Sequence, residues 1–137
     1  MSKNKILIVE DNTVLLERLK NWLEQDGYEV FTAIEEPPAR KIIREKEPDL
    51  VLSDVRLPKG DGLELLEWMN VNNINIPFVV MTGYSNVADA VKAMKLGAID
   101  YLVKQCGIEN IRQITNDLLR KSQRGTPQGN KFRRKSK

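Results

Sequence analysis

Short apolar runs alternate with amphipathic segments five times along this chain. The apolar runs, at residues 5–9, 28–33, 50–53, 76–81 and 99–103, have the length of buried strands. The segments between and after them repeat apolar residues at three- and four-residue spacing, which predicts helices up to Gly27 and over about 39–45, 62–70, 87–94 and 111–118. Strands that are apolar at every position predict a parallel sheet covered on both faces, an open doubly wound α/β fold with right-handed crossovers.

Polar side chains follow four of the five predicted strands. Glu10 and Asp11 follow the first strand, Asp54 the third, Thr82 the fourth and Lys104 the fifth. Ligands of doubly wound sheets bind beyond the carboxyl ends of the strands, so these side chains are expected to meet at one edge.

Three carboxylates at one edge resist ionisation unless a cation joins them, so the pattern predicts a metal site. Oxygen ligands without histidine or cysteine favour a hard ion such as Mg²⁺. Lys104 adds a fixed positive charge and Thr82 a hydroxyl donor, which suits a phosphoryl group in transfer. Asp54 is then the nucleophile that forms an aspartyl phosphate.

Each of these residues also has an ordinary structural explanation. Glu10 and Asp11 could cap the helix that begins near residue 12 or 13, and Asp54 could start a turn. Thr82 could cap the fourth helix, and Lys104 could be a surface lysine. Their shared position at the carboxyl ends of strands favours a site.

Composition narrows the class of protein. The chain has 137 residues, 41% apolar and 30% charged, enough for one domain. No apolar run approaches the ~18 residues that a membrane span needs, and the start becomes acidic before a signal-peptide core could form, so we expect a cytoplasmic protein. The chain has no histidine and one cysteine, Cys106, which excludes an internal disulfide and a zinc framework and leaves a buried, inert thiol as the expectation.

Charge divides the chain into an acidic body and a basic end. Residues 1–120 hold 15 Lys and Arg against 19 Asp and Glu, a net of −4, and residues 121–137 hold seven Lys and Arg and no acid, a net of +7. The end reads "KSQRGTPQGNKFRRKSK" and has little to bury, which predicts a flexible basic tail or linker after a domain at 1–120. Contact of this tail with nucleic acid is the alternative.

Four segments resemble the receiver domain of two-component response regulators: "ILIVEDN", "PDLVLSDVRLPKGDGLELL", "IPFVVMTGYSN" and "AMKLGAIDYLVK". The resemblance covers about residues 4–120 and implies a flavodoxin-like (βα)5 fold with strand order 2-1-3-4-5. The resemblance also assigns roles to individual residues. The metal ligands would be Glu10, Asp11, Asp54 and the backbone carbonyl of Arg56. Asp54 would be the phosphoacceptor, Thr82 and Tyr101 would be the switch pair, and Lys104 would bind the phosphate.

The resemblance also implies partners and an output. The phosphoryl group would come from a sensor histidine kinase or a histidine phosphotransfer protein, and the signalling domain would not be an enzyme. Phosphorylation would change the face formed by the fourth helix, fifth strand and fifth helix and favour a homodimer. The segment from Thr82 to Lys104 is most similar to nitrogen-regulator-type receivers, which precede an AAA+ ATPase and a DNA-binding domain. We therefore expect control of transcription. The receiver body itself is expected to bind neither a membrane nor nucleic acid directly. "FRRKSK" could begin such a module.

Other readings compete with this one. A free-standing receiver in a phosphorelay is the runner-up. A haloacid-dehalogenase-type phosphatase would require a second acid two residues after the nucleophile, where this chain has Arg56. Nucleotide binding is disfavoured, because no Gly-rich phosphate loop follows the first predicted strand. A degenerate receiver that only binds proteins would be expected to have lost acids or Lys104.

Three positions bear on the details of the site. Gln105 follows Lys104 where the family usually has proline, often with a cis bond, and a cis bond before any other residue costs ~2.5–4 kcal/mol. The placement of Lys104 is therefore open. Arg56 and Tyr84 lie two residues after Asp54 and Thr82, at the places that tune hydrolysis in the family. Their bulk predicts slow loss of the phosphoryl group, unless both side chains point into solvent.

Overall fold

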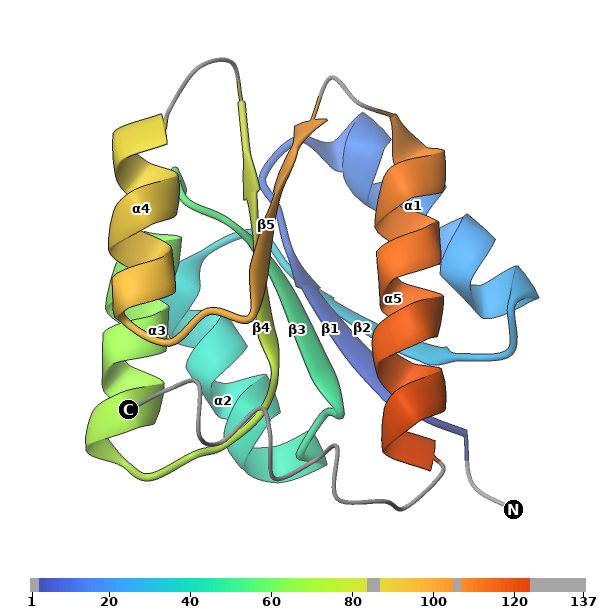
Figure 1. Cartoon of the computed structure of the whole chain (residues 1–137), viewed down its shortest axis with the longest axis horizontal. Helices are drawn as coiled ribbons and strands as arrows, with labels where there is room; N and C mark the ends of the chain where they lie inside the picture. The colour runs from blue at the N-terminus through green and yellow to red at the C-terminus, as the bar shows by residue number, and fades with distance from the viewer. Residues whose placement is uncertain (1–2, 84–86, 105–106, 124–137) are drawn as a thin grey trace.

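A parallel sheet of five strands forms the centre of the molecule (Figure 1). The computed structural model describes residues 3–83, 87–104 and 107–123. The strands are β1 (Lys5–Val9), β2 (Glu29–Ala33), β3 (Leu50–Asp54), β4 (Phe78–Thr82) and β5 (Asp100–Val103). Their order is β2-β1-β3-β4-β5, and every neighbouring pair is parallel. The predicted fold class and strand order are confirmed.

Helices cover both faces of this sheet. They are α1 (Thr13–Gln25), α2 (Glu36–Lys46), α3 (Gly62–Val71), α4 (Val87–Lys95) and α5 (Ile108–Gln123). Figure 1 shows α1 and α5 on one side of the sheet and α2, α3 and α4 on the other. Each helix follows a strand and returns the chain to the amino edge of the sheet, so all carboxyl ends of the strands meet at the opposite edge.

The strands divide the apolar core into two clusters. Successive side chains of a strand point to opposite faces, so Ile6 and Ile8 pack with α1 and α5 whereas Leu7 and Val9 pack with α2, α3 and α4. All four are fully buried. Burial on both faces explains why the central strands are apolar at successive positions and show no alternation.

Local signals explain most of the helix ends. The side chain of Asn12 accepts hydrogen bonds from the N–H groups of the first turn of α1 and caps it. Gly27, with φ +97°, follows α1 in the left-handed region that favours glycine. Pro37 and Pro38 lie inside the first turn of α2, where proline needs no hydrogen-bond partner, so the helix begins earlier than the predicted residue 39.

The strand boundaries differ from the prediction by one or two residues. Asp54 and Thr82 are the last residues of β3 and β4, whereas the sequence predicted that they directly follow these strands. α5 continues to Gln123, beyond the predicted domain boundary at residue 120. The rest of the predicted tail, residues 124–137, lies outside the described residues, as do Tyr84, Gln105 and Cys106. Among the described residues, no helix is long and apolar enough to span a membrane.

Candidate functional site

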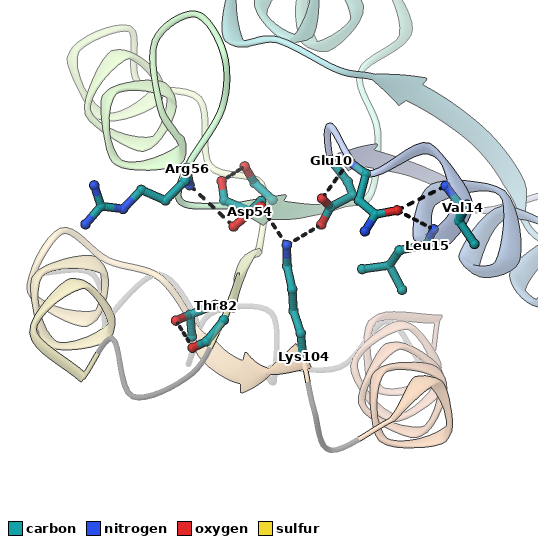
Figure 2. A network of polar contacts seen from close by, with 10 residues as sticks. Glu10, Val14, Leu15, Asp54, Arg56, Thr82 and Lys104 are labelled. Atoms are coloured by element: carbon teal, nitrogen blue, oxygen red, sulfur yellow. Dashed lines mark hydrogen bonds and ion pairs between the residues drawn. The ribbon is translucent and has the colours of Figure 1, made fainter.

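A buried acidic cluster occupies the carboxyl edge of the sheet, where β1 and β3 lie side by side (Figure 2). Glu10 is fully buried and Asp54 is 5% exposed, while Asp11 is exposed at the rim. Carboxylate oxygens of the three residues lie within 4.8 Å of one another. The strand order therefore brings together acids that are more than forty residues apart in the sequence.

The ammonium group of Lys104 bridges two of these acids. Nζ lies 2.7 Å from Oδ2 of Asp54 and 2.9 Å from Oε1 of Glu10. Burial acts to lower the pKa of Lys104, but the hydrogen bond to Asp54 and the negative charges of Asp54 and Glu10 outweigh it and hold the pKa above its usual value. Lys104 is thus a charged part of the cluster, and the explanation as an unrelated surface lysine does not hold.

The two oxygens of the buried Glu10 carboxyl group have different surroundings. Its Oε2 accepts the backbone N–H of Asn12 at 2.9 Å. Its Oε1 is buried and makes no hydrogen bond of good geometry, although Lys104 Nζ lies close enough for an ion pair. Burial is the main reason that the pKa of Glu10 is raised; the nearby ammonium of Lys104 and the hydrogen bond from the N–H of Asn12 oppose it in part. Because Asn12 caps α1, the carboxylate of Asp11 is left for the cluster.

The loop from β3 to α3 folds tightly over Asp54. The backbone N–H of Arg56 points at Oδ1 of Asp54 at 3.3 Å, and the hydroxyl of Ser53 donates to the Asp54 carbonyl at 2.8 Å. A Cβ on Gly62 would lie 2.3 Å from that carbonyl, so this position admits no side chain without moving the backbone. The bridge between Arg56 and Asp61 closes the loop. The loop therefore needs glycine at position 62 to lie over Asp54, and the sequence pattern did not predict this constraint.

The side chain of Arg56 does not lie over the acids. Figure 2 shows it extending away from Asp54, and its Nη2 lies 3.3 Å from Oδ2 of Asp89 in α4. Sequence reasoning did not find Asp89, because nothing in the pattern pairs two residues 33 positions apart. Tyr84, the second residue expected to tune hydrolysis, lies outside the described residues.

The two predicted switch residues lie beyond the acids on neighbouring strands. Thr82 is 3% exposed, and its hydroxyl donates to the carbonyl of Gly83 at 2.9 Å. Tyr101 on β5 is 43% exposed. It borders an apolar groove of about 290 Å³ with Ala90, Val91, Met94 and Lys95 of α4. The ring is therefore outward in this structure and has a groove beside it.

The cluster fits a divalent cation of the hard class. Three carboxylates against one ammonium leave a formal surplus of two negative charges, and the ligand atoms are all oxygens. The buried Oε1 of Glu10 has no aligned hydrogen-bond donor and lies 2.9 Å from the single ammonium of Lys104, so it can serve as a ligand for a cation.

The comparisons with known proteins place the chain in a family. The model of the response regulator receiver domain matches residues 6–116. The chain therefore belongs to the receiver domains of response regulators, a family of signalling domains rather than of enzymes. This agrees with the doubly wound sheet and with the cluster at its carboxyl edge.

Several relatives are transcriptional regulators. The chain is 37% identical over 110 residues to the alginate biosynthesis transcriptional regulatory protein AlgB of Pseudomonas aeruginosa, covering 80% of this chain and 24% of that protein. It is 40% identical over 111 residues to the transcriptional regulatory protein ZraR of Escherichia coli K12, covering 78% of this chain and 24% of ZraR. The chain thus spans about a quarter of these relatives.

Solved structures give the same fold. The receiver domain of NtrX from Brucella abortus has a TM-score of 0.78 and 28% identity, covering 84% of this chain and 98% of that one. The signal receiver domain of a LuxO repressor protein from Vibrio parahaemolyticus has a TM-score of 0.82 and 26% identity, covering 89% and 94%. AlgB, ZraR and NtrX together confirm the predicted likeness to the nitrogen-regulator-type group.

Proposed function

We propose that this chain is a phosphorylation-dependent switch in which Asp54 accepts a phosphoryl group from the histidine of a sensor kinase or phosphotransfer protein. The observation that carries the proposal is the Asp54 carboxylate itself. It is buried at the carboxyl edge of the sheet, with an ammonium group at 2.7 Å and two further carboxylates within 4.8 Å. A nucleophile that is buried among opposite and like charges is typical of a reaction centre, not of a turn.

In the transfer, a carboxylate oxygen of Asp54 attacks phosphorus. The bond from phosphorus to the donor histidine nitrogen breaks, and its electron pair returns to the imidazole. Lys104 then offers its positive charge to the phosphoryl oxygens, which carry the negative charge during transfer. The 137 residues include no histidine, so the donor is a histidine outside this sequence or a small phosphodonor.

The acidic cluster would hold a magnesium ion. Its ligands would be the carboxylates of Glu10, Asp11 and Asp54 with the backbone carbonyl of Arg56. When bound, the ion supplies positive charge for the phosphoryl oxygens. The chain's own contribution is to hold three acids close enough to share one cation while burying two of them, Glu10 and Asp54.

Thr82 and Tyr101 would convert phosphorylation into a change of shape. The hydroxyl of Thr82 can exchange the carbonyl of Gly83 for a phosphoryl oxygen, which leaves room for the ring of Tyr101 to turn inward. The face formed by α4, β5 and α5, with the exposed apolar side chains of Val91 and Met94, would then pair with a second copy.

The output would be transcription. Relatives whose names describe transcriptional regulation carry this type of domain as about a quarter of their length. The acidic balance of residues 1–120, 15 basic against 19 acidic side chains, disfavours direct binding of this body to nucleic acid.

The experiment is phosphorylation by a small phosphodonor with Mg²⁺, followed by intact mass. We expect one added phosphoryl group on the parent and none on Asp54→Asn. The matched control is Asp49→Asn, which makes the same substitution just before the amino end of β3. Labelling of Asp54→Asn at the parent's level, or loss of labelling in Asp49→Asn as well, would contradict the assignment.

The switch is tested separately by its effect on association. Beryllofluoride, a mimic of the phosphoryl group, should shift the parent toward a dimer in sedimentation velocity. Thr82→Ala should weaken this shift, because the hydroxyl that binds the new group is missing. Equal dimerisation with and without beryllofluoride would contradict the proposed switch.

A further inference from the structure

An ion pair links the phosphoacceptor loop to the helix that precedes β5. Nη2 of Arg56, in the loop after β3, lies 3.3 Å from Oδ2 of Asp89 in the first turn of α4. The same Arg56 directs its backbone N–H at Oδ1 of Asp54, also at 3.3 Å. Arg56 thus contacts Asp54 through its backbone and α4 through its side chain.

The two side chains of this ion pair differ in how freely they can move. The side chain of Asp89 is 14% exposed and is anchored on a helix, whereas that of Arg56 is 76% exposed. An arginine on a loop can turn its long side chain at low cost, but the short Asp89 cannot follow it. If the pair breaks, Arg56 is the partner that moves, and its backbone position keeps it beside Asp54.

We propose that Asp89 is a positioning residue that holds the guanidinium of Arg56 away from Asp54 and thereby shortens the lifetime of the aspartyl phosphate. This inference rests on the proposed function. A phosphoryl group on Asp54 brings phosphate oxygens next to Arg56, and guanidinium pairs strongly and often bidentately with phosphate. Asp89 and the phosphoryl group therefore compete for one cation.

The competition acts on hydrolysis. A water molecule attacks phosphorus, the bond from phosphorus to the Asp54 oxygen breaks with its electron pair going to the carboxylate, and the proton of the water passes to the phosphate released. Attack requires a line of approach behind phosphorus. Arg56 bound to the phosphoryl oxygens would crowd that line and stabilise the phosphorylated state, whereas Arg56 held by Asp89 leaves the line open.

Removal of the acid tests this directly. Asp89→Asn keeps the size of the side chain and releases Arg56, so the phosphorylated protein should lose its phosphate about two- to fivefold more slowly, the range that an exposed ion pair can contribute. In an Arg56→Gln background the same change should have no effect, since the guanidinium that it releases is absent. This dependence separates positioning of Arg56 from a general effect on α4.

The experiment compares four proteins: the parent, Asp89→Asn, Arg56→Gln and the double variant. Each is phosphorylated on Asp54 by a small phosphodonor, freed of donor and followed by intact mass at fixed Mg²⁺ and ionic strength. Glu109→Gln is the matched control, because it removes an exposed acid from the first turn of α5 and changes the net charge equally. We expect the control to lose phosphate at the parent's rate.

Three results would overturn the inference: Asp89→Asn loses phosphate as fast as the parent or faster, it slows loss equally without Arg56, or Glu109→Gln slows loss as much. Failure of Asp54 to become labelled in the parent would instead overturn the proposed function. The two failures are therefore distinguishable. Thermal unfolding of each variant confirms that the compared proteins are folded.

Discussion

Two clusters of acids and bases on this fold differ in their balance of charge. At the carboxyl edge, Glu10 and Asp54 share one lysine. Between α1 and α5, Asp26 has its own arginine: Arg112 donates to it through Nε at 2.6 Å and through an Nη, and the guanidinium also stacks 4.9 Å from the ring centre of Trp22. The first cluster has more acids than cations, and the second is balanced.

The pKa shifts follow this difference. The pKa of Asp26 is lowered, mainly by the hydrogen bond from Arg112 and against a smaller effect of burial. The pKa of Glu10 is raised, mainly by burial. A paired surface acid stabilises the fold when it is charged, whereas the charged form of Glu10 is held in place at a cost. Such a cost is expected where a site is kept ready for a cation.

The largest expected effect is the loss of the shared lysine. Lys104→Met leaves two buried carboxylates without their counter-charge, and we expect it to lower the free energy of unfolding by about 2 kcal/mol; the 22% exposure of Lys104 keeps the loss below that of a fully buried pair. Mg²⁺ should restore part of the loss. Urea unfolding with and without Mg²⁺ measures both effects, with Lys41→Met on the exposed surface of α2 as control. An equal loss in the two variants would contradict the special role of Lys104.

A smaller effect of opposite sign is expected at Glu10. Glu10→Gln keeps an acceptor for the N–H of Asn12 but removes the buried charge, so without Mg²⁺ it should raise the free energy of unfolding near pH 7 by about 1 kcal/mol. Because the folded pKa of Glu10 lies above 4.5, the folded parent binds the proton more tightly than the unfolded chain. The parent therefore loses stability as the pH rises from 4.5 through the folded pKa, and the variant should not. Parallel pH profiles would disprove this.

The smallest effect is expected at Asp26, with the reverse pH dependence. Asp26→Asn should lower the melting temperature near pH 7 by about 2 °C, the scale of a partly exposed ion pair in a domain of this size. The folded pKa of Asp26 lies below 3.8, so its contribution is complete above 3.8 and is lost as the pH falls through the folded value. Melting curves of parent and variant should thus converge at acid pH. A difference that grows on acidification would refute the sign.

Much of this molecule could be predicted from the sequence. The apolar runs predicted all five strands and, through their lack of alternation, a sheet covered on both faces. The position of Glu10, Asp54 and Lys104 after such runs predicted that they would meet, because parallel strands align their carboxyl ends. Strand ends were less accurate: Asp54 and Thr82 lie within their strands, since pairing with a neighbour, which the local pattern does not contain, decides where a strand stops.

Contacts between side chains from different elements were decided only by the tertiary structure. The sequence identified Arg56 as a residue near the nucleophile but could not give its partner, because Asp89 reaches it through the packing of α4 beside the loop after β3. It also left open the exact placement of Lys104; the structure places its ammonium group between Glu10 and Asp54. Short-range patterns fix which residues form strands and helices, because they depend on period and burial. Long side chains from separate elements find their partners only when the sheet order and the helix packing set the distances between them.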